Sequence, residues 1–197
     1  MAIALEGTPS VIVDGGSYTA ETTGSDRVVV FACCGDNTYN HDISSIDMGT
    51  QAATLGKAPA GNRKAPTALY YILEADIPTG SQVITMGGSS TASQITCYTL
   101  SGVDQTTPIK ASGADDSETS SMAIGSTATD ADGYAITCGG YDVGNATFNT
   151  APDTSEGFTV YAEAEVVNGP KGSFARTTSG TAVTCTYVDS TASSSCV

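Results

Sequence analysis

The sequence predicts an all-β protein: a single antiparallel β-sandwich of the jelly-roll type, with about ten short strands and little or no helix. Three observations support this fold class. Apolar residues recur at alternate positions, turn residues separate the runs, and charged residues make up only 14% of a chain rich in Thr, Val and Gly. A chain of 197 residues, 40% of them hydrophobic, can bury a core of this kind.

The predicted strands fall into two kinds. Residues 27–34 (RVVVFACC) form a nearly continuous apolar run, as expected for a strand covered on both faces. The others alternate, most cleanly in residues 158–166, where every second side chain from Phe158 to Val166 is apolar. In chain order, the remaining predicted strands are residues 10–13, 43–48, 51–55, 67–75, 81–86, 94–100, 121–126, 133–138 and 181–188.

Two features of the chain set its expected organisation. Residues 67–75 (TALYYILEA) have some helical propensity, but their length, the Tyr pair and the nearby prolines favour a strand. No change in composition divides the chain. We therefore expect an N-terminal arm or edge strand at residues 1–10, one β-sandwich domain at residues 11–190, and a C-terminal tail at residues 191–197.

The charge of the chain disfavours two classes of partner. Seven Lys and Arg against 21 Asp and Glu give a net charge of −14. Nucleic acids and anionic membranes attract basic surfaces, so neither is expected to bind. No run approaches the roughly 20 apolar residues of a membrane span. The first residues lack the basic region of a secretory signal, so folding in the cytoplasm is expected.

The six cysteines are not predicted to be a disulfide framework, and those within alternating strands are expected to be small buried hydrophobic residues in a reducing compartment. Cys33 and Cys34 are adjacent, so one should point inward and the other outward. Cys196, next to the C-terminus, is the best candidate for an exposed or intermolecular thiol. Zinc is disfavoured because there is no CxxC pair and only one histidine. Three cysteines continue the alternation of predicted strands: Cys97, Cys138 and Cys185.

No catalytic residue and no cofactor are predicted, so the chain is not expected to be an enzyme. His41 is the only histidine, and no GxSxG motif is present. The acidic pairs Asp115–Asp116 and Glu163/Glu165 are expected to be solvated. Residues 130–133 (DADG) are similar to the opening of a calcium loop but lack its later ligands, so Ca²⁺ shared between acidic loops is left as an alternative.

One charged segment is a candidate contact site. Lys57, Arg63 and Lys64 place three of the seven positive residues within a single Pro/Gly-rich stretch, KAPAGNRKAP. On an acidic protein, such a basic patch could dock against an acidic partner. A solvated loop without a partner explains the same residues equally well.

A family resemblance extends these inferences. In residues 101–109 (SGVDQTTPI), Gly102 and Asp104 mark a turn and Pro108 cannot donate to a central ladder, which predicts a strand leaving its sheet into a structured corner. This segment resembles β-sandwich virion proteins of tailed phages and related lectin-like jelly-roll modules of bacterial surface proteins. Residues 27–34, 43–55, 67–86 and 132–136 are similar to other strands of that family.

The resemblance implies a function. It points to a non-enzymatic virion structural protein, most simply a capsid decoration or cement protein on the outer surface of a tailed-phage head. Such a protein would be made in the host cytoplasm, form a homotrimer and bind the major capsid protein. The alternatives are a carbohydrate-binding or adhesive jelly-roll module and a tail or fibre subunit. Five tyrosines could contribute an aromatic glycan platform: Tyr39, Tyr70, Tyr71, Tyr98 and Tyr141.

Overall fold

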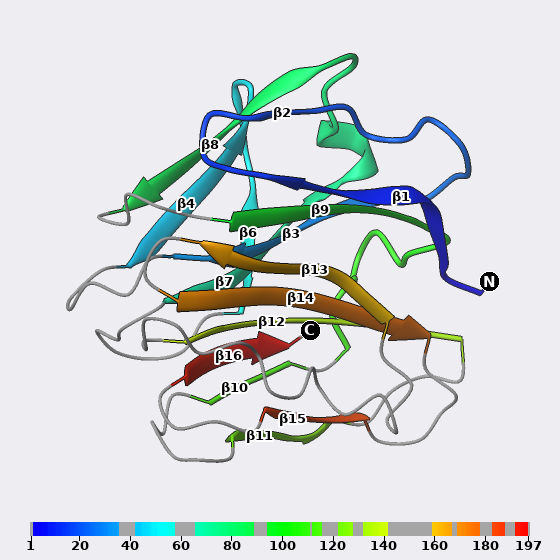
Figure 1. Ribbon diagram of the computed structural model, residues 1–197. Helices are drawn as coiled ribbons and strands as arrows, with labels where there is room; N and C mark the ends of the chain where they lie inside the picture. Colours follow the sequence, from blue (N-terminus) through cyan, green and yellow to red (C-terminus); the bar gives the residue numbers. More distant parts are fainter. Residues whose placement is uncertain are drawn as a thin grey trace.

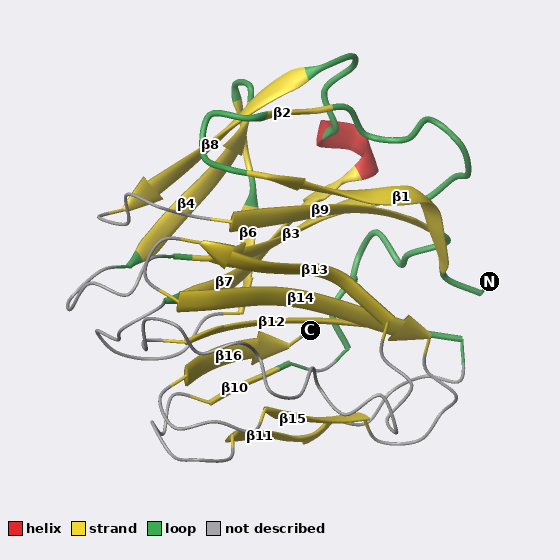
Figure 2. Ribbon diagram, in the orientation of Figure 1, coloured by secondary structure: helices red, strands yellow, loops and turns green. Residues whose placement is uncertain are grey.

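A computed structural model defines the fold (Figures 1 and 2). It describes residues 2–35, 42–57, 66–88, 94–110, 112–115, 122–127, 132–141, 159–166, 169–177, 183–187 and 192–196. The described residues are nearly all strand or connecting turn, and every strand pairing is antiparallel. The predicted fold class, an all-β antiparallel sandwich with little helix, is confirmed.

The first half of the chain forms a two-sheet sandwich. A central sheet has the order β1 (Ala4–Ile12), β9 (Gln94–Ser101), β3 (Val28–Cys34), β7 (Thr67–Leu73) and β6 (Thr54–Lys57). A four-stranded sheet has the order β2 (Ser17–Tyr18), β8 (Gln82–Gly88), β4 (Ile43–Met48) and β5 (Gln51–Ala52). The first core lies between them and includes Phe31, Ile46, Met48, Ile84 and Ile95.

A second five-stranded sheet covers the other face of the central sheet. Its order is β10 (Gly113–Asp115), β16 (Ala192–Cys196), β12 (Tyr134–Tyr141), β14 (Gly169–Thr177) and β13 (Thr159–Val166). In Figure 1 its strands run in nearly the same direction as those of the central sheet, while β4 and β8 cross at an angle. Strand β12 packs over β3 and β7, and β14 packs over β3, so a second core lies between these two sheets. Strands β11 (Met122–Thr127) and β15 (Val183–Tyr187) pair separately.

Strand β3 is therefore buried on both faces, as its unbroken apolar sequence predicts. Val29, Phe31 and Cys33 belong to the first core, and Val28 and Val30 to the second. All eight residues of β9 are also buried, although its sequence alternates apolar and polar residues. The second five-stranded sheet explains the difference, because it covers the face of β9 that the alternation would leave to solvent.

Several element boundaries differ from the sequence-based expectation. Residues 67–75 form a strand only to Leu73, where a single 3-10 turn, η1 (Glu74–Asp76), begins. Residues 51–55 divide into β5 and β6, because Ala53 turns inward and its N–H donates to the carbonyl of Ile46. At the N-terminus, residues 4–12 form β1, an edge strand of the central sheet. In the described residues no helix has the length and hydrophobicity to cross a membrane.

Strands β14 and β16 lack the apolar alternation that would predict them. The predicted C-terminal tail at residues 191–197 contains β16, which lies inside the second five-stranded sheet between β10 and β12. Its sequence, ASSSC, offers little apolar surface. Main-chain hydrogen bonds to two neighbouring strands form this strand, and such bonds do not depend on side-chain hydrophobicity.

Candidate functional site

Of the three residues in the predicted basic patch, only Lys57 is among the residues that the structure describes. Lys57 ends β6, the outermost strand of the central sheet, and lies beside Leu69 of β7. Arg63 and Lys64 lie outside the described residues. The ammonium group of Lys57 is therefore carried on a half-buried residue at a sheet edge, rather than within a loop as expected. We call residues Thr54–Lys57 the β6 edge.

The β6 edge has three properties of a contact surface. Among the described residues no strand pairs with its outer side, so backbone N–H and C=O groups there are open to pairing. Leu55 is 53% exposed, one of four large hydrophobic residues exposed among those described. Lys57 adds a positive charge on an acidic protein. A partner with an extended, acidic segment could use all three properties at once.

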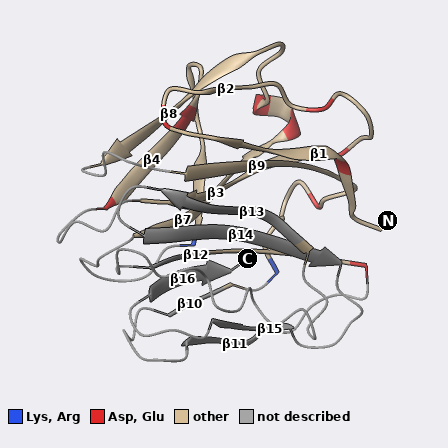
Figure 3. Ribbon diagram, in the orientation of Figure 1, with Lys and Arg blue, Asp and Glu red and all other residues tan. Residues whose placement is uncertain are grey.

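Acidic groups lie on several other elements. Figure 3 shows acidic positions along η1, on β1 near the N-terminus and on β4. Glu74 of η1 follows the far end of β7, several residues from the position where Lys57 pairs. The central sheet thus carries a cation at the β6 edge and carboxylates around the end of β7 and on β1. This separation gives the two regions different electrostatic preferences for a partner.

The segment SGVDQTTPI forms a corner whose side chains bond within the chain. Asp104 accepts hydrogen bonds from the backbone N–H groups of Thr106, at 2.8 Å, and Thr107, at 3.1 Å. It also accepts one from the Thr107 hydroxyl at 2.8 Å, and the Lys110 ammonium lies 3.5 Å away. These donors, led by the Thr106 N–H, lower the pKa of Asp104. The arrangement is an Asx turn that fixes the direction in which the chain leaves β9.

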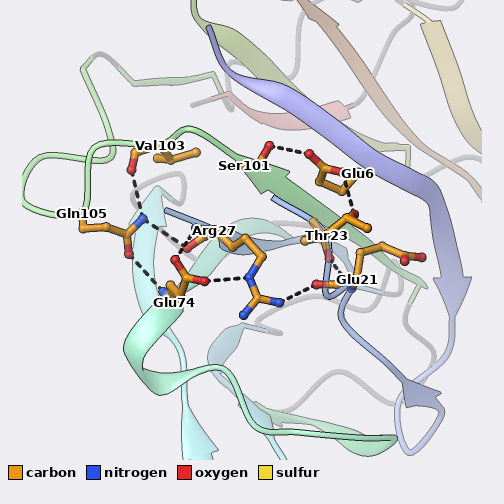
Figure 4. A network of polar contacts seen from close by, with 9 residues as sticks. Glu6, Glu21, Thr23, Arg27, Glu74, Ser101, Val103 and Gln105 are labelled. Carbon is orange, nitrogen blue, oxygen red and sulfur yellow. Dashed lines mark hydrogen bonds and ion pairs between the residues drawn. The ribbon is translucent and has the colours of Figure 1, made fainter. Parts of the chain in front are cut away.

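Gln105 joins three segments that are far apart in the sequence (Figure 4). Its amide oxygen accepts from the backbone N–H of Glu74 at 3.0 Å. Its amide nitrogen donates to the carbonyls of Arg27 at 3.1 Å and Val103 at 3.0 Å. The start of β3, the end of β7 and the end of β9 are therefore held by one side chain. Sequence reasoning identified the segment but not this role of Gln105.

Charged groups complete the corner. The Arg27 guanidinium lies 2.8 Å from the Glu74 carboxylate, and the Arg27 backbone N–H donates to the same group at 3.1 Å. The hydrogen bond from the Arg27 side chain is the main cause that lowers the pKa of Glu74. On β1, the hydroxyls of Ser101 and Thr23 donate to Glu6, and these two bonds, Ser101 first, lower its pKa. The polar side chains of this network hydrogen-bond to other groups of the same chain, which favours a structural role over ligand binding.

Two of the five tyrosines considered for glycan binding are buried in different cores. Tyr98 lies fully buried in the second core, and Tyr70 belongs to the first, where its hydroxyl donates to the carbonyl of Ile43 at 2.9 Å. Burial raises the pKa of Tyr70 to about 12. Tyr71 is half-buried. Tyr39 lies outside the described residues, and only the backbone of Tyr141 is described. Tyr70 and Tyr98 therefore cannot stack on a sugar.

The described residues contain no group of three or more His, Cys, Asp and Glu side chains suited to hold a metal ion. Asp130, from the calcium-like DADG segment, and His41 lie outside the described residues. Asp132 is exposed in the turn before β12.

Comparison with known proteins does not add to this description. Searches against models of protein families, against curated proteins and against solved structures find no match to this chain. The geometry of the site therefore has to be interpreted from its own residues.

Proposed function

We propose that this chain is a non-enzymatic structural protein of a virion, a capsid decoration or cement protein on the outer surface of a tailed-phage head. The observation that carries the proposal is the corner at residues 101–109. Its sequence resembles that of phage β-sandwich proteins. In the structure, its polar side chains hold strand ends together instead of facing a binding cleft.

The two-sided burial of the central sheet also supports a mechanical role. A sheet whose strands β3 and β9 are wholly buried cannot bend without disturbing two cores at once. A rigid body of this kind suits a protein that spans neighbouring capsid subunits. Its net charge of −14 suits display in many copies, because like charges oppose clumping.

Attachment would use the β6 edge, together with Arg63 and Lys64 from the basic stretch. The partner would be an acidic surface of the major capsid protein, and the attached form a homotrimer. A protein that binds the assembled shell but not its disrupted form stabilises the shell by RT ln(1 + [L]/Kd) per site. No chemistry is needed for this effect, only affinity for the assembled state.

The test is co-sedimentation of the purified protein with heads assembled without it, followed by heating of the loaded heads. Saturable binding at a fixed number of copies per capsomer, with a higher temperature of DNA release, is the expected result. Absence of binding to heads would overturn the proposal. Binding to tails or fibres alone, or to glycans on an array, would favour one of the alternatives.

Charge variants locate the attachment surface. Replacing Lys57, Arg63 and Lys64 together by Gln should weaken binding to heads about tenfold at low salt, and less as salt rises. Lys110→Gln is the matched control, because it removes an exposed cation that lies 3.5 Å from Asp104, away from the β6 edge. Lys57→Gln removes one charge, as Lys110→Gln does, and equal losses in these two single variants would show that total charge, and not the β6 edge, governs binding.

A further inference from the structure

Two cysteines face each other across the second core. Cys34 is the last residue of β3 in the central sheet, and Cys138 lies in β12 of the second five-stranded sheet. Both side chains belong to the second core, and they are 1% and 0% exposed. In the sequence they are separated by more than half of the chain. Only the packing of one sheet on the other brings them together.

The contacts of the two thiols are reciprocal. The Cys34 Sγ donates to the carbonyl of Gly139, the residue after Cys138, at 3.3 Å. The Cys138 Sγ donates to the carbonyl of Cys33, the residue before Cys34, at 3.6 Å. Each sulfur therefore reaches the main chain beside the other cysteine. The Cys138 Sγ also lies 3.8 Å from the carbonyl oxygen of Ala68, on the neighbouring strand β7. A disulfide requires Cβ atoms about 3.5–4.5 Å apart, and we infer from the reciprocal contacts that the two side chains can reach that separation.

We propose that Cys34 and Cys138 are an oxidative cross-linking site that can join the central sheet to the second five-stranded sheet by a disulfide. With a small-molecule disulfide such as oxidised glutathione as the oxidant, the Cys34 thiolate attacks one sulfur and releases a glutathione thiolate. The Cys138 thiolate then attacks the Cys34 sulfur of the mixed disulfide and releases the second glutathione thiolate. The two cysteines lose two protons and two electrons, and the oxidant is reduced to two thiols.

The other described cysteines form a contrasting pair. Cys33 and Cys97 face the first core from adjacent strands, Cys33 beside Ile95 and Cys97 beside Phe31. Both belong to the central sheet, so a disulfide between them would not join one sheet to another. Burial raises the pKa of both thiols. Cys33 and Cys34 point to opposite faces of the central sheet, but both are buried, so the expectation that one of them points outward is wrong. They are neighbours in sequence that belong to different cores, which supplies a matched pair of variants.

Burial determines when the cross-link can form. An oxidant reaches the second core only while the two sheets are apart, as during folding or in mild denaturant. Once formed, the bond closes a loop of about 100 residues and restricts the unfolded chain, so the unfolding midpoint should rise by about 10 °C. This inference is independent of the proposed function, because it depends only on the contact between the sheets.

The experiment is refolding of the full chain from denaturant with reduced and oxidised glutathione, followed by intact-mass measurement and thiol titration. We expect the mass to fall by two hydrogens without a glutathione adduct, four of the six thiols to remain, and the midpoint rise to be reversed by reductant. Six titratable thiols after refolding of the wild-type chain would overturn the proposal without reliance on any variant.

Variants identify the residues involved. Cys34→Ser and Cys138→Ser should each abolish the cross-link, whereas Cys33→Ser should retain it with its rise in midpoint. Peptide mapping alone cannot separate Cys33 from Cys34, because they are adjacent, so this comparison is required. A cross-link that persists in Cys34→Ser, or disappears in Cys33→Ser, would contradict the assignment.

Discussion

The two cores on either side of the central sheet differ in how they treat polar groups. In the first core, Tyr18 and Thr99 share a hydrogen bond of 2.7 Å, and Thr99 also accepts from the N–H of Glu21 at 3.2 Å. In the second core, Thr96 is fully buried and its hydroxyl has no hydrogen-bond partner among the described residues. Gln94 is 3% exposed, and in the part of the chain that the structure describes neither its amide nitrogen nor its amide oxygen has a hydrogen-bond partner.

Both kinds of environment occur on the same strand. Thr96 and Thr99 belong to β9 and point to opposite faces of the central sheet. A buried polar group without a partner loses about 1–3 kcal/mol relative to one that is bonded. Among the described residues, the side chain of Thr99 is therefore bonded in the first core, whereas those of Thr96 and Gln94 are unbonded in the second. Removing an unbonded polar group of β9 should stabilise the second core, and removing the bonded one should destabilise the first.

Truncation of adjacent residues on β3 gives the largest expected effects. Phe31→Ala opens a cavity in the first core and should lower the free energy of unfolding by about 3–5 kcal/mol. Val30→Ala, in the second core, should lower it by about 2 kcal/mol. Urea unfolding measures both. In a two-sheet sandwich without a covering layer Val30 would face solvent, so a loss below about 0.5 kcal/mol would contradict the second core.

Removal of the unpartnered amide should stabilise the protein. Gln94→Met keeps a similar length without polar atoms that need partners, so the free energy of unfolding should rise by about 1–3 kcal/mol. Thr99→Val is the matched opposite, because it removes a bonded hydroxyl from the first core and should destabilise. Urea unfolding measures the denaturant midpoint of each variant. If both midpoints shift in the same direction, the proposed difference between the two cores is wrong.

Acid should loosen the contacts around the corner at residues 101–109 before it loosens β12. Asp104 of the corner, and Glu6 and Glu74 beside it, have lowered pKa values when folded. Lowered values mean that their stabilisation is present above the ordinary pKa, 4.5 for Glu, and is lost as pH falls through the folded values. Hydrogen exchange from neutral pH to pH 3 should show residues 21–27 and 101–107 opening before β12. Glu74→Gln should weaken this pH dependence, and an unchanged profile would contradict the role of Glu74.

A surface change should have the smallest effect. Val83 is 48% exposed on β8 and is not part of either core. Val83→Thr should change the free energy of unfolding by less than about 0.5 kcal/mol. Thermal unfolding of the variant and the wild-type protein, each at two protein concentrations, measures the difference between their midpoints. A larger loss, dependent on protein concentration, would show that the outer face of the four-stranded sheet is covered by another copy.

The candidate contact residues could be predicted only in part. The basic stretch was apparent from composition, but whether Lys57 stands in a loop or on an edge strand depends on pairing with β7. Gln105 and Glu74 are 31 residues apart, and Gln105 and Arg27 are 78 apart. Such contacts form only after three strand ends have been placed by the sheet. Local sequence patterns carry no information about that placement.

The sequence by itself determined the strand character, the turns between strands and the unusual burial of residues 27–34. These follow from side-chain periodicity and backbone preferences, which act over a few residues. Only the tertiary structure decided that a second sheet covers β9, that ASSSC becomes the interior strand β16, and that Cys34 meets Cys138. Those outcomes depend on hydrogen bonds and packing between distant segments, which form only when the whole sheets assemble.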